Sequence, residues 1–142
     1  MKTVRQLLQG KTSAVYTIGS AAPVIEALRQ MAEREIGALP VVDGEKLVGM
    51  LSERDYARKV ILQGKSSRDT PVREIMTTRV VCVGPANTVD DCMALMTERR
   101  IRHLPVLEHG KLAGMLSIGD LVKDVISEQR QTIEQLESYI HS

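Results

Sequence analysis

The chain has 142 residues, of which 43% are hydrophobic and 26% are charged, as in an ordinary globular protein. Its 19 Lys and Arg residues and 18 Asp and Glu residues leave a formal charge of +1, and it contains no Trp or Phe. It therefore lacks the basic field and the stacking platforms that are typical of nucleic-acid binding, and we expect no nucleic-acid partner.

The N-terminal residues, the apolar runs and the cysteines indicate the cellular compartment of the protein. The first residues, MKTVRQLLQGKTS, lack the apolar centre of a signal peptide, and no apolar run approaches the ~20 residues of a membrane span. Two cysteines, Cys82 and Cys92, and three scattered histidines do not form a zinc-binding pattern. We expect a soluble, cytoplasmic protein without a metal ion or a membrane partner.

A tandem duplication organises the chain. Val15–Ile61 aligns without a gap with Val80–Ile126, and both copies contain Leu-Pro-Val and Gly-Met-Leu-Ser. Short leading segments ahead of each copy, residues 3–8 and 71–76, also correspond. We therefore expect a single module, 1–142, made of a first repeat at 3–62 and a second at 71–126, each with its leading segment, and a helical tail at 127–142.

Each copy predicts the same first two elements. Val15–Ile18 and Val80–Val83 are expected as short strands, because β-branched residues are followed by turn residues. An amphipathic helix follows in each copy, because apolar residues recur at helical spacing. These residues are Val24, Ala27, Leu28 and Met31 in the first copy and Val89, Cys92, Met93 and Met96 in the second. Cys92 is thus expected to be a small apolar core residue.

The rest of each copy predicts a hairpin and a closing helix. Strands are expected at Ala38–Val42 and Lys46–Leu51, joined by an Asp43-Gly44 turn, and a helix begins near Ser52 and again near Ser117. A three-stranded sheet with helices on one face leaves apolar surface that the other copy can cover. The expected fold class is α/β: two tandem β-α-β-β-α repeats packed face to face with pseudo-twofold symmetry.

The tail after Ile126 is expected to continue as an amphipathic helix. Ile133, Leu136 and Ile140 recur at spacings of three and four. This helix would either cover the core of its own chain or pack on a second subunit.

The element Gly-Met-Leu-Ser-x-x-Asp occurs at 49–55 and at 114–120 and supports two interpretations. Ser followed by an acidic residue three positions later is close to a capping box, which would be purely structural. The same geometry suits a ligand, because free N–H groups at a helix start can meet an anion and the Asp can accept two hydrogen bonds from a cis-diol. A diol and a phosphate together describe a ribonucleotide.

The repeat order, the Leu-Pro-Val strand and the Ser-x-x-Asp element resemble a CBS-domain pair. The resemblance covers nearly the whole chain. Through Ser52–Lys59 and Ile101–Val106 the chain is similar in particular to small stand-alone CBS-pair proteins of bacteria and plant organelles. It implies that an adenine nucleotide such as AMP, ADP, ATP or NAD(H), or S-adenosylmethionine, binds in clefts between the repeats. It also implies a homodimer.

The resemblance further implies which residues bind the ligand. In one cleft Asp55 would hold the ribose and Ser52 would lie near the sugar or phosphate, and Asp120 and Ser117 would do so in the other. Backbone of the opposite repeat would hold the adenine, with Thr17, Ile18 and Ala22 serving the Asp120 cleft and Val83 and Asn87 the Asp55 cleft. Ala38 and His103, which precede Leu-Pro-Val, would face the ligand, although His103 could instead be a core residue. Arg54 would be a phosphate partner or part of a solvated helix face.

Catalysis has little support. The serines have no accompanying His base and Asp, and the chain contains neither G-x-G-x-x-G nor a Walker sequence. We therefore expect a non-enzymatic sensor that binds AMP, ATP or NAD(H) and transmits its occupancy to an unknown regulated protein. The alternative is a protein-interaction or redox-regulatory module whose nucleotide clefts are vestigial.

Overall fold

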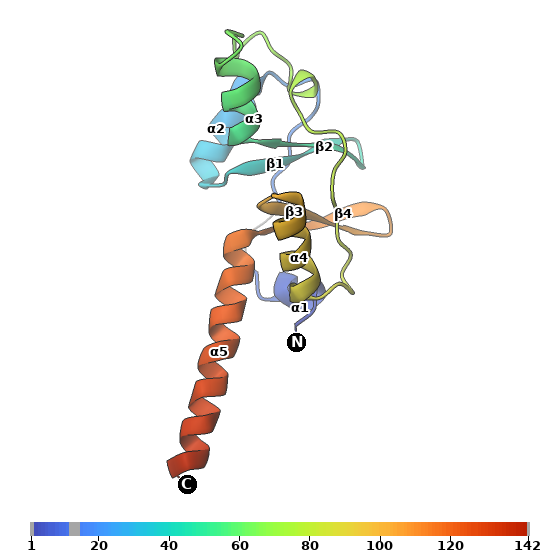
Figure 1. Ribbon diagram of the computed structural model, residues 1–142. Coiled ribbons are helices and arrows are strands. Elements are labelled where there is room, and N and C mark those ends of the chain that lie inside the picture. Colours follow the sequence, from blue (N-terminus) through green and yellow to red (C-terminus); the bar gives the residue numbers. More distant parts are fainter. Residues whose placement is uncertain (1, 12–14, 142) are drawn as a thin grey trace. The chain divides into compact units, whose positions relative to one another are not determined.

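The computed structural model describes residues 2–11 and 15–141 (Figure 1). Met1, residues 12–14 and Ser142, which the expected repeats and tail include, lie outside the described residues. The elements in chain order are α1 (Val4–Gln9), α2 (Val24–Arg34), β1 (Ala38–Asp43), β2 (Lys46–Ser52), α3 (Glu53–Tyr56), the π-helical turn η1 (Ala57–Ile61), the 3-10 turn η2 (Val72–Glu74), α4 (Val89–Arg99), β3 (His103–Glu108), β4 (Lys111–Ser117) and α5 (Ile118–His141). None of these helices combines the length and apolar character that crossing a membrane requires.

The elements form two compact units, each built on one copy of the duplication. One unit contains the described residues of Ser13–Cys82 together with the hairpin tip Leu107–Ala113, and the other contains those of Met1–Thr12, Val83–Val106 and Gly114–Ser142. The two-repeat α/β fold expected from the sequence is confirmed at this level.

In the first unit, α2 and the helix formed by α3 and η1 pack against the β1–β2 hairpin. Its core consists of Ile18, Val24, Ala27, Met31, Leu39, Val41, Leu51, Val60, Val72 and Ile75. The hairpin turn lies one residue later than expected, because Asp43 pairs with Lys46 and leaves Gly44 and Glu45 in the turn. Gly44 has a φ of 63°, a backbone conformation that favours glycine.

Within residues 2–11 and 15–141 the sheet of each unit has two strands, so the expected third strand is wrong in both units. Val15–Ile18 contributes one parallel bridge, in which Ile18 N–H donates to Pro40 O and Val42 N–H donates to Ile18 O. The next bond of a parallel ladder would need an N–H from Pro40, and proline has none. Val83 makes the matching single bridge to Val106, beside Pro105.

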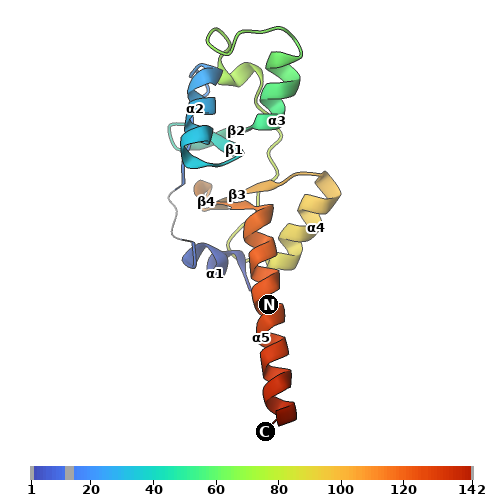
Figure 2. The same ribbon diagram turned by 90° about the vertical axis from the view of Figure 1, so that its left-hand side faces the viewer.

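The second unit repeats this arrangement with α4, α5 and the parts of β3 and β4 outside the hairpin tip (Figure 2). Val89, Cys92 and Met96 are buried on one face of α4, which confirms the helical stripe and the core position of Cys92. The expected continuous helix after Ile126 is also confirmed as far as the structure describes it, because α5 runs without a break to His141.

Each leading segment belongs to the unit that is built on the other repeat. Val72 and Ile75 belong to the core of the first unit, and Val72 N–H donates to Ala22 O. The N-terminal segment instead joins the second unit, where Val4 is fully buried and its N–H donates to Asn87 O.

A hydrogen bond after the short polar connection accounts for the position of the second leading segment. Thr70 O accepts from Val24 N–H at 2.9 Å, and this bond brings the chain back to the start of α2. The segment behind Thr70 therefore stays on the first unit. The first leading segment is then the one that covers the second unit.

Candidate functional site

The Ser-x-x-Asp motif of the first unit forms a reciprocal capping box at the end of β2. Asp55 N–H donates to Ser52 Oγ at 3.1 Å, and Ser52 N–H donates to Asp55 Oδ2 at 3.0 Å. The Ser52 hydroxyl also donates to Asp55 Oδ2, at 3.0 Å. The capping interpretation of the motif is thus confirmed, and the cap fixes the orientation of the Asp55 carboxylate.

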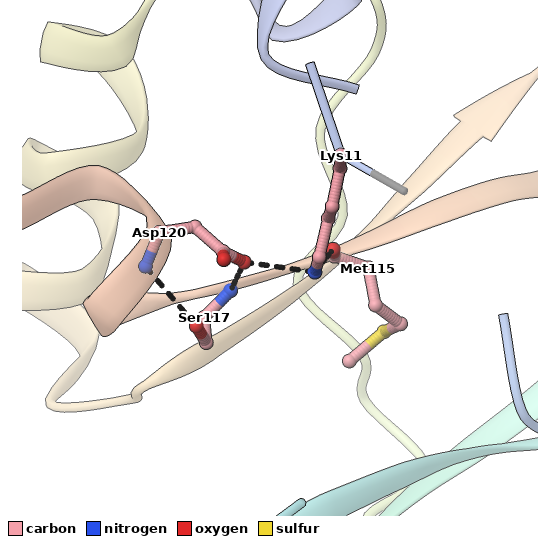
Figure 3. Close-up of polar contacts among 4 residues, drawn as sticks. All are labelled: Lys11, Met115, Ser117 and Asp120. Carbon is pink, nitrogen blue, oxygen red and sulfur yellow. Dashed lines mark hydrogen bonds and ion pairs between the residues drawn. The ribbon is translucent and has the colours of Figure 1, made fainter. Parts of the chain in front are cut away.

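The second unit builds the same box at the start of α5. Ser117 N–H donates to Asp120 Oδ2 at 2.8 Å, and Asp120 N–H donates to Ser117 Oγ at 3.2 Å (Figure 3). In both copies the first N–H of the helix donates to a backbone carbonyl ahead of the Leu-Pro-Val strand: Glu53 to Gly37 and Ile118 to Arg102. The duplicated sequence therefore produces duplicated local geometry.

A lysine lies beside each motif carboxylate, but the two lysines come from different parts of the chain. Lys59 is one turn after Asp55 on the closing helix, and its Nζ lies 3.3 Å from Asp55 Oδ1 and donates to Ile75 O at 3.0 Å. Lys11 comes from the N-terminal segment, and its Nζ donates to Asp120 Oδ2 at 2.8 Å and to Met115 O at 2.7 Å (Figure 3). Each ammonium group thus joins a motif carboxylate to a backbone carbonyl.

The carboxylates of Asp55 and Asp120 differ in how many of their oxygens have a protein partner. Asp55 has protein partners on both oxygens, whereas Asp120 uses Oδ2 and has no partner on Oδ1 among residues 2–11 and 15–141. Burial alone would raise the pKa of Asp120, but the hydrogen bonds from Lys11 and Ser117 and the Lys11 charge outweigh it and lower that pKa below 3.8. Asp120 is therefore a charged, oriented acceptor whose Oδ1 has no partner among the described residues.

Replacing Lys11 by Met is expected to lower the free energy of unfolding at neutral pH by about 0.2–1 kcal/mol. The folded-state pKa of Asp120 is depressed, so the stability that it contributes is present above the unfolded pKa and is lost as the pH falls through the folded one. The difference between wild type and variant should therefore shrink below about pH 4. Urea unfolding at a series of pH values measures it.

The exposed lysine Lys65 supplies the control for this prediction. Lys65→Met removes the same charge at a surface position and should change the stability little at any pH. A Lys11→Met difference that stays constant from neutral pH to about pH 3 would show that the aliphatic chain of Lys11, and not its ion pair, carries the effect.

The first unit holds five further residues that the resemblance implied. Ala38 is buried at the start of β1 and pairs with Ser52 across the hairpin, which puts the two at one end of the motif. Ile18 is buried in the core, and Thr17 is exposed. Ala22 closes a turn with Gly19, and Arg54 is exposed on α3, away from any ion pair that the described residues make.

The second unit holds the other three. Val83 is buried, and Asn87 uses its side chain to order the loop before α4, where Gly84 N–H donates to Asn87 Oδ1 at 2.8 Å. His103 is half-buried at the start of β3. Val83 and Asn87 thus share a unit with Asp120, and Thr17, Ile18 and Ala22 share one with Asp55. The expectation that each adenine contact comes from the opposite repeat joins residues of different units and stays a prediction.

Sequence reasoning missed Lys11 and Lys59. The spacing of Asp55 and Lys59 on one helix was a usable signal, because residues four apart are neighbours on a helix surface. No comparable signal linked Lys11 to Asp120, since the contact depends on the exchange of the leading segments.

Neither cysteine has the lowered thiol pKa of a reactive cysteine. Burial raises the pKa of Cys92 to about 11, with a further contribution from the charge of Asp91, and burial also raises the pKa of Cys82. Both thiols are thus kept in the protonated, unreactive form at neutral pH. No group of three or more His, Cys, Asp or Glu side chains in the described part of the chain is placed to hold a metal ion.

Comparison with known proteins identifies the duplicated unit. The family model described as CBS domain matches residues 4–61 and 72–127. The mitochondrial CBS domain-containing protein CBSX3 of Arabidopsis thaliana is 43% identical over 122 residues, which cover 82% of this chain. The chain spans 59% of the length of that relative.

Solved structures agree with this match. A protein with CBS domains from Burkholderia ambifaria is 54% identical, with a TM-score of 0.87, over 90% of this chain and 96% of that one. The CBS domain pair of protein MJ0100, solved in complex with 5'-methylthioadenosine and S-adenosyl-L-methionine, is 25% identical, with a TM-score of 0.80, over 90% of this chain and 98% of that one. The chain belongs to the CBS-domain family and carries the domain in two copies.

Proposed function

We propose that the chain is a regulatory module that binds an adenine nucleotide at its Ser-x-x-Asp motifs and transmits the occupancy to a partner protein. The observation that carries this proposal is the Asp120 carboxylate, which its cap holds in place and whose Oδ1 is bonded to none of residues 2–11 and 15–141. A charged oxygen in this position can accept a hydrogen bond from a ribose hydroxyl group. The candidate ligands are AMP, ADP, ATP and NAD(H), which share the adenosine end.

Lys11 adds a second group to the same place. Its ammonium group has three N–H donors, of which two have partners in the described part of the chain, Asp120 and Met115 O. The third can donate to an oxygen of a ligand bound at Asp120. The Asp120 motif therefore offers an acceptor and a donor side by side, whereas a diol at Asp55 must compete with Lys59.

The family supports a regulatory, non-catalytic function. CBS-domain pairs are regulatory modules, and the relative MJ0100 holds two adenosine-derived ligands. Ser52 and Ser117 both serve as helix caps, since Asp55 N–H donates to Ser52 Oγ and Asp120 N–H donates to Ser117 Oγ. By the same resemblance we propose that the chain is a homodimer. The cytoplasmic location stays a prediction, since the Arabidopsis relative is named as a mitochondrial protein.

Calorimetric titration of the nucleotide-stripped protein with AMP, ATP, NAD, NADH and S-adenosylmethionine tests the proposal. We expect one of them to bind in the micromolar range, about −8 kcal/mol. A ligand present at about 100 times its dissociation constant should add about 2.7 kcal/mol of stability, which a thermal unfolding experiment detects as a shift of several degrees. Absence of binding by all five ligands would contradict the sensor function.

The alternative is an interaction module with vestigial nucleotide sites, and one observation favours it: Asp55 has protein partners on both of its oxygens. Its redox form has less support, because the raised pKa values of Cys82 and Cys92 make both thiols poor nucleophiles. Titration separates the two functions, since an interaction module would show no nucleotide-dependent stabilisation.

A further inference from the structure

The last turns of α5 carry an apolar stripe that the described part of the chain does not cover. Every residue of 129–141 is exposed, and the side chains of Ile133, Leu136 and Ile140 are 55%, 59% and 74% exposed. Figures 1 and 2 both show this part of the helix running beyond α1 and α4 of its own unit. Most of the stability of a helix in a protein comes from packing of its apolar face, and the described residues supply no such packing here.

The apolar residues of α5 follow a seven-residue repeat. Ile126, Ile133 and Ile140 occupy one core position of the heptad, and Val122, Gln129 and Leu136 occupy the other. Apolar residues that recur at these two positions form the contact line of a coiled coil, and here Leu136 supplies the second position within the exposed turns. The outward positions of the same turns are polar: Ser127, Glu128, Gln131, Glu134, Gln135, Ser138 and His141. The stripe therefore has the width of a two-helix contact.

We propose that Gln129–Ile140, called here the α5 seam, pairs in antiparallel orientation with the α5 seam of a second copy of the chain. Around a twofold axis, Ile133 of each copy packs on Leu136 of the other, and Gln129 lies across from Ile140 in the outermost, wet layers. The same register brings Arg130 opposite Glu137 of the second copy, and the symmetry repeats this pair.

Charge complementarity selects the second copy and the antiparallel orientation. Arg130 and Glu137 are the charged residues that flank the seam within its length, and they pair with each other only when the helices run in opposite directions. A parallel pair would place Arg130 beside Val125 and Glu137 beside Thr132, without opposite charges. The seam is thus complementary to itself.

The contact is short, so the association should depend on concentration. Twelve residues at 1.5 Å each give a seam of about 18 Å, much smaller than a standard interface. We expect a dissociation constant of ~10–100 µM. Pairing through the seam does not depend on nucleotide binding, so it can fail or succeed independently of the proposed function.

Sedimentation velocity of the full chain over a range of concentrations, with charge-swapped variants, tests the proposal. Arg130→Glu and Glu137→Arg should each weaken the concentration-dependent step about 10-fold, because each creates two like-charge contacts. The double variant Arg130→Glu, Glu137→Arg should restore it, since the pairs re-form with reversed sign. Ile133→Glu should abolish the step.

Gln131→Glu, on the outward face of the same turns, adds the same charge as Ile133→Glu and should leave association unchanged. Because all of these positions are exposed, the variants should retain the thermal midpoint of the wild type at low concentration. An association that neither single swap weakens, or that the double swap does not restore, would overturn the antiparallel pairing.

Discussion

Replacing Asp120 by Ala is expected to weaken the binding of the nucleotide on the order of 100-fold, and replacing Asp55 by Ala to weaken it less. A diol that donates both hydroxyl groups to Asp120 Oδ1 loses two charge-assisted hydrogen bonds of about 1.5 kcal/mol each, which corresponds to that factor. Asp55 already shares Oδ1 with Lys59, so a ligand there gains less from the carboxylate. Calorimetric titration with the ligand that binds wild type measures both variants.

The substitution also removes a helix cap, and the chain offers a matched control for that loss. Asp91 forms the same capping box with Thr88 at the start of α4, where Thr88 N–H donates to Asp91 Oδ2 at 2.9 Å. Asp91→Ala also removes the bond from Asn87 Nδ2 to Asp91 Oδ2; it should reduce stability by about 1 kcal/mol, as Asp120→Ala does through its cap, and should leave affinity at Asp120 unchanged. Equal affinities of Asp120→Ala and wild type would remove Asp120 from the binding site.

Gly49→Ala is expected to destabilise the first unit by about 1–3 kcal/mol, and Gly114→Ala to destabilise the second unit by less, although the two glycines are equivalent in the duplication. A Cβ on Gly49 would lie 2.6 Å from Met76 Sδ and 2.9 Å from the backbone oxygen of Thr77. That oxygen is fixed, because Met50 and Thr77 exchange both of their backbone hydrogen bonds. The leading segment must therefore move as a whole.

At Gly114 the obstacle is a flexible side chain. A Cβ there would lie 2.6 Å from a terminal methyl group of Leu8, which can turn away at small cost. Urea unfolding of the two variants gives the comparison, and at this chain length 1 kcal/mol corresponds to a shift of the thermal midpoint of about 2–4 °C. A larger loss for Gly114→Ala than for Gly49→Ala would show that the Leu8 side chain is more tightly held than the Thr77 backbone.

The elements that sequence reasoning placed correctly are those with local signals. The stripes of α2 and α4 repeat at helical spacing, and Ser-x-x-Asp encodes its own cap within four residues. The prediction of a first strand in each repeat was wrong because a strand also needs hydrogen bonds from the strand beside it. Pro40 and Pro105 have no N–H to donate to a neighbouring strand. The residues of Val15–Ile18 contain no sign of this.

The features that escaped prediction depend on contacts between distant segments. Both leading segments have a similar apolar pattern, so either could have covered either repeat, and the pattern alone does not choose. Lys11 reaches Asp120 only because the N-terminal segment joins the second unit. The carboxylates of the site were therefore predictable, whereas the cation beside Asp120 was not.

The crossed leading segments have a consequence for how such a chain is made on the ribosome. The N-terminal residues emerge first, yet their binding surface is completed only when α5 has been synthesised, so they must wait while the first unit forms behind them. Cutting the chain between the two repeats would give two fragments. Each fragment would contain the leading segment that packs on the other fragment. A solitary ancestral repeat could satisfy the same pattern only by trading segments with a second molecule. When the two repeats are joined in one chain, the exchange of segments is intramolecular and does not depend on protein concentration.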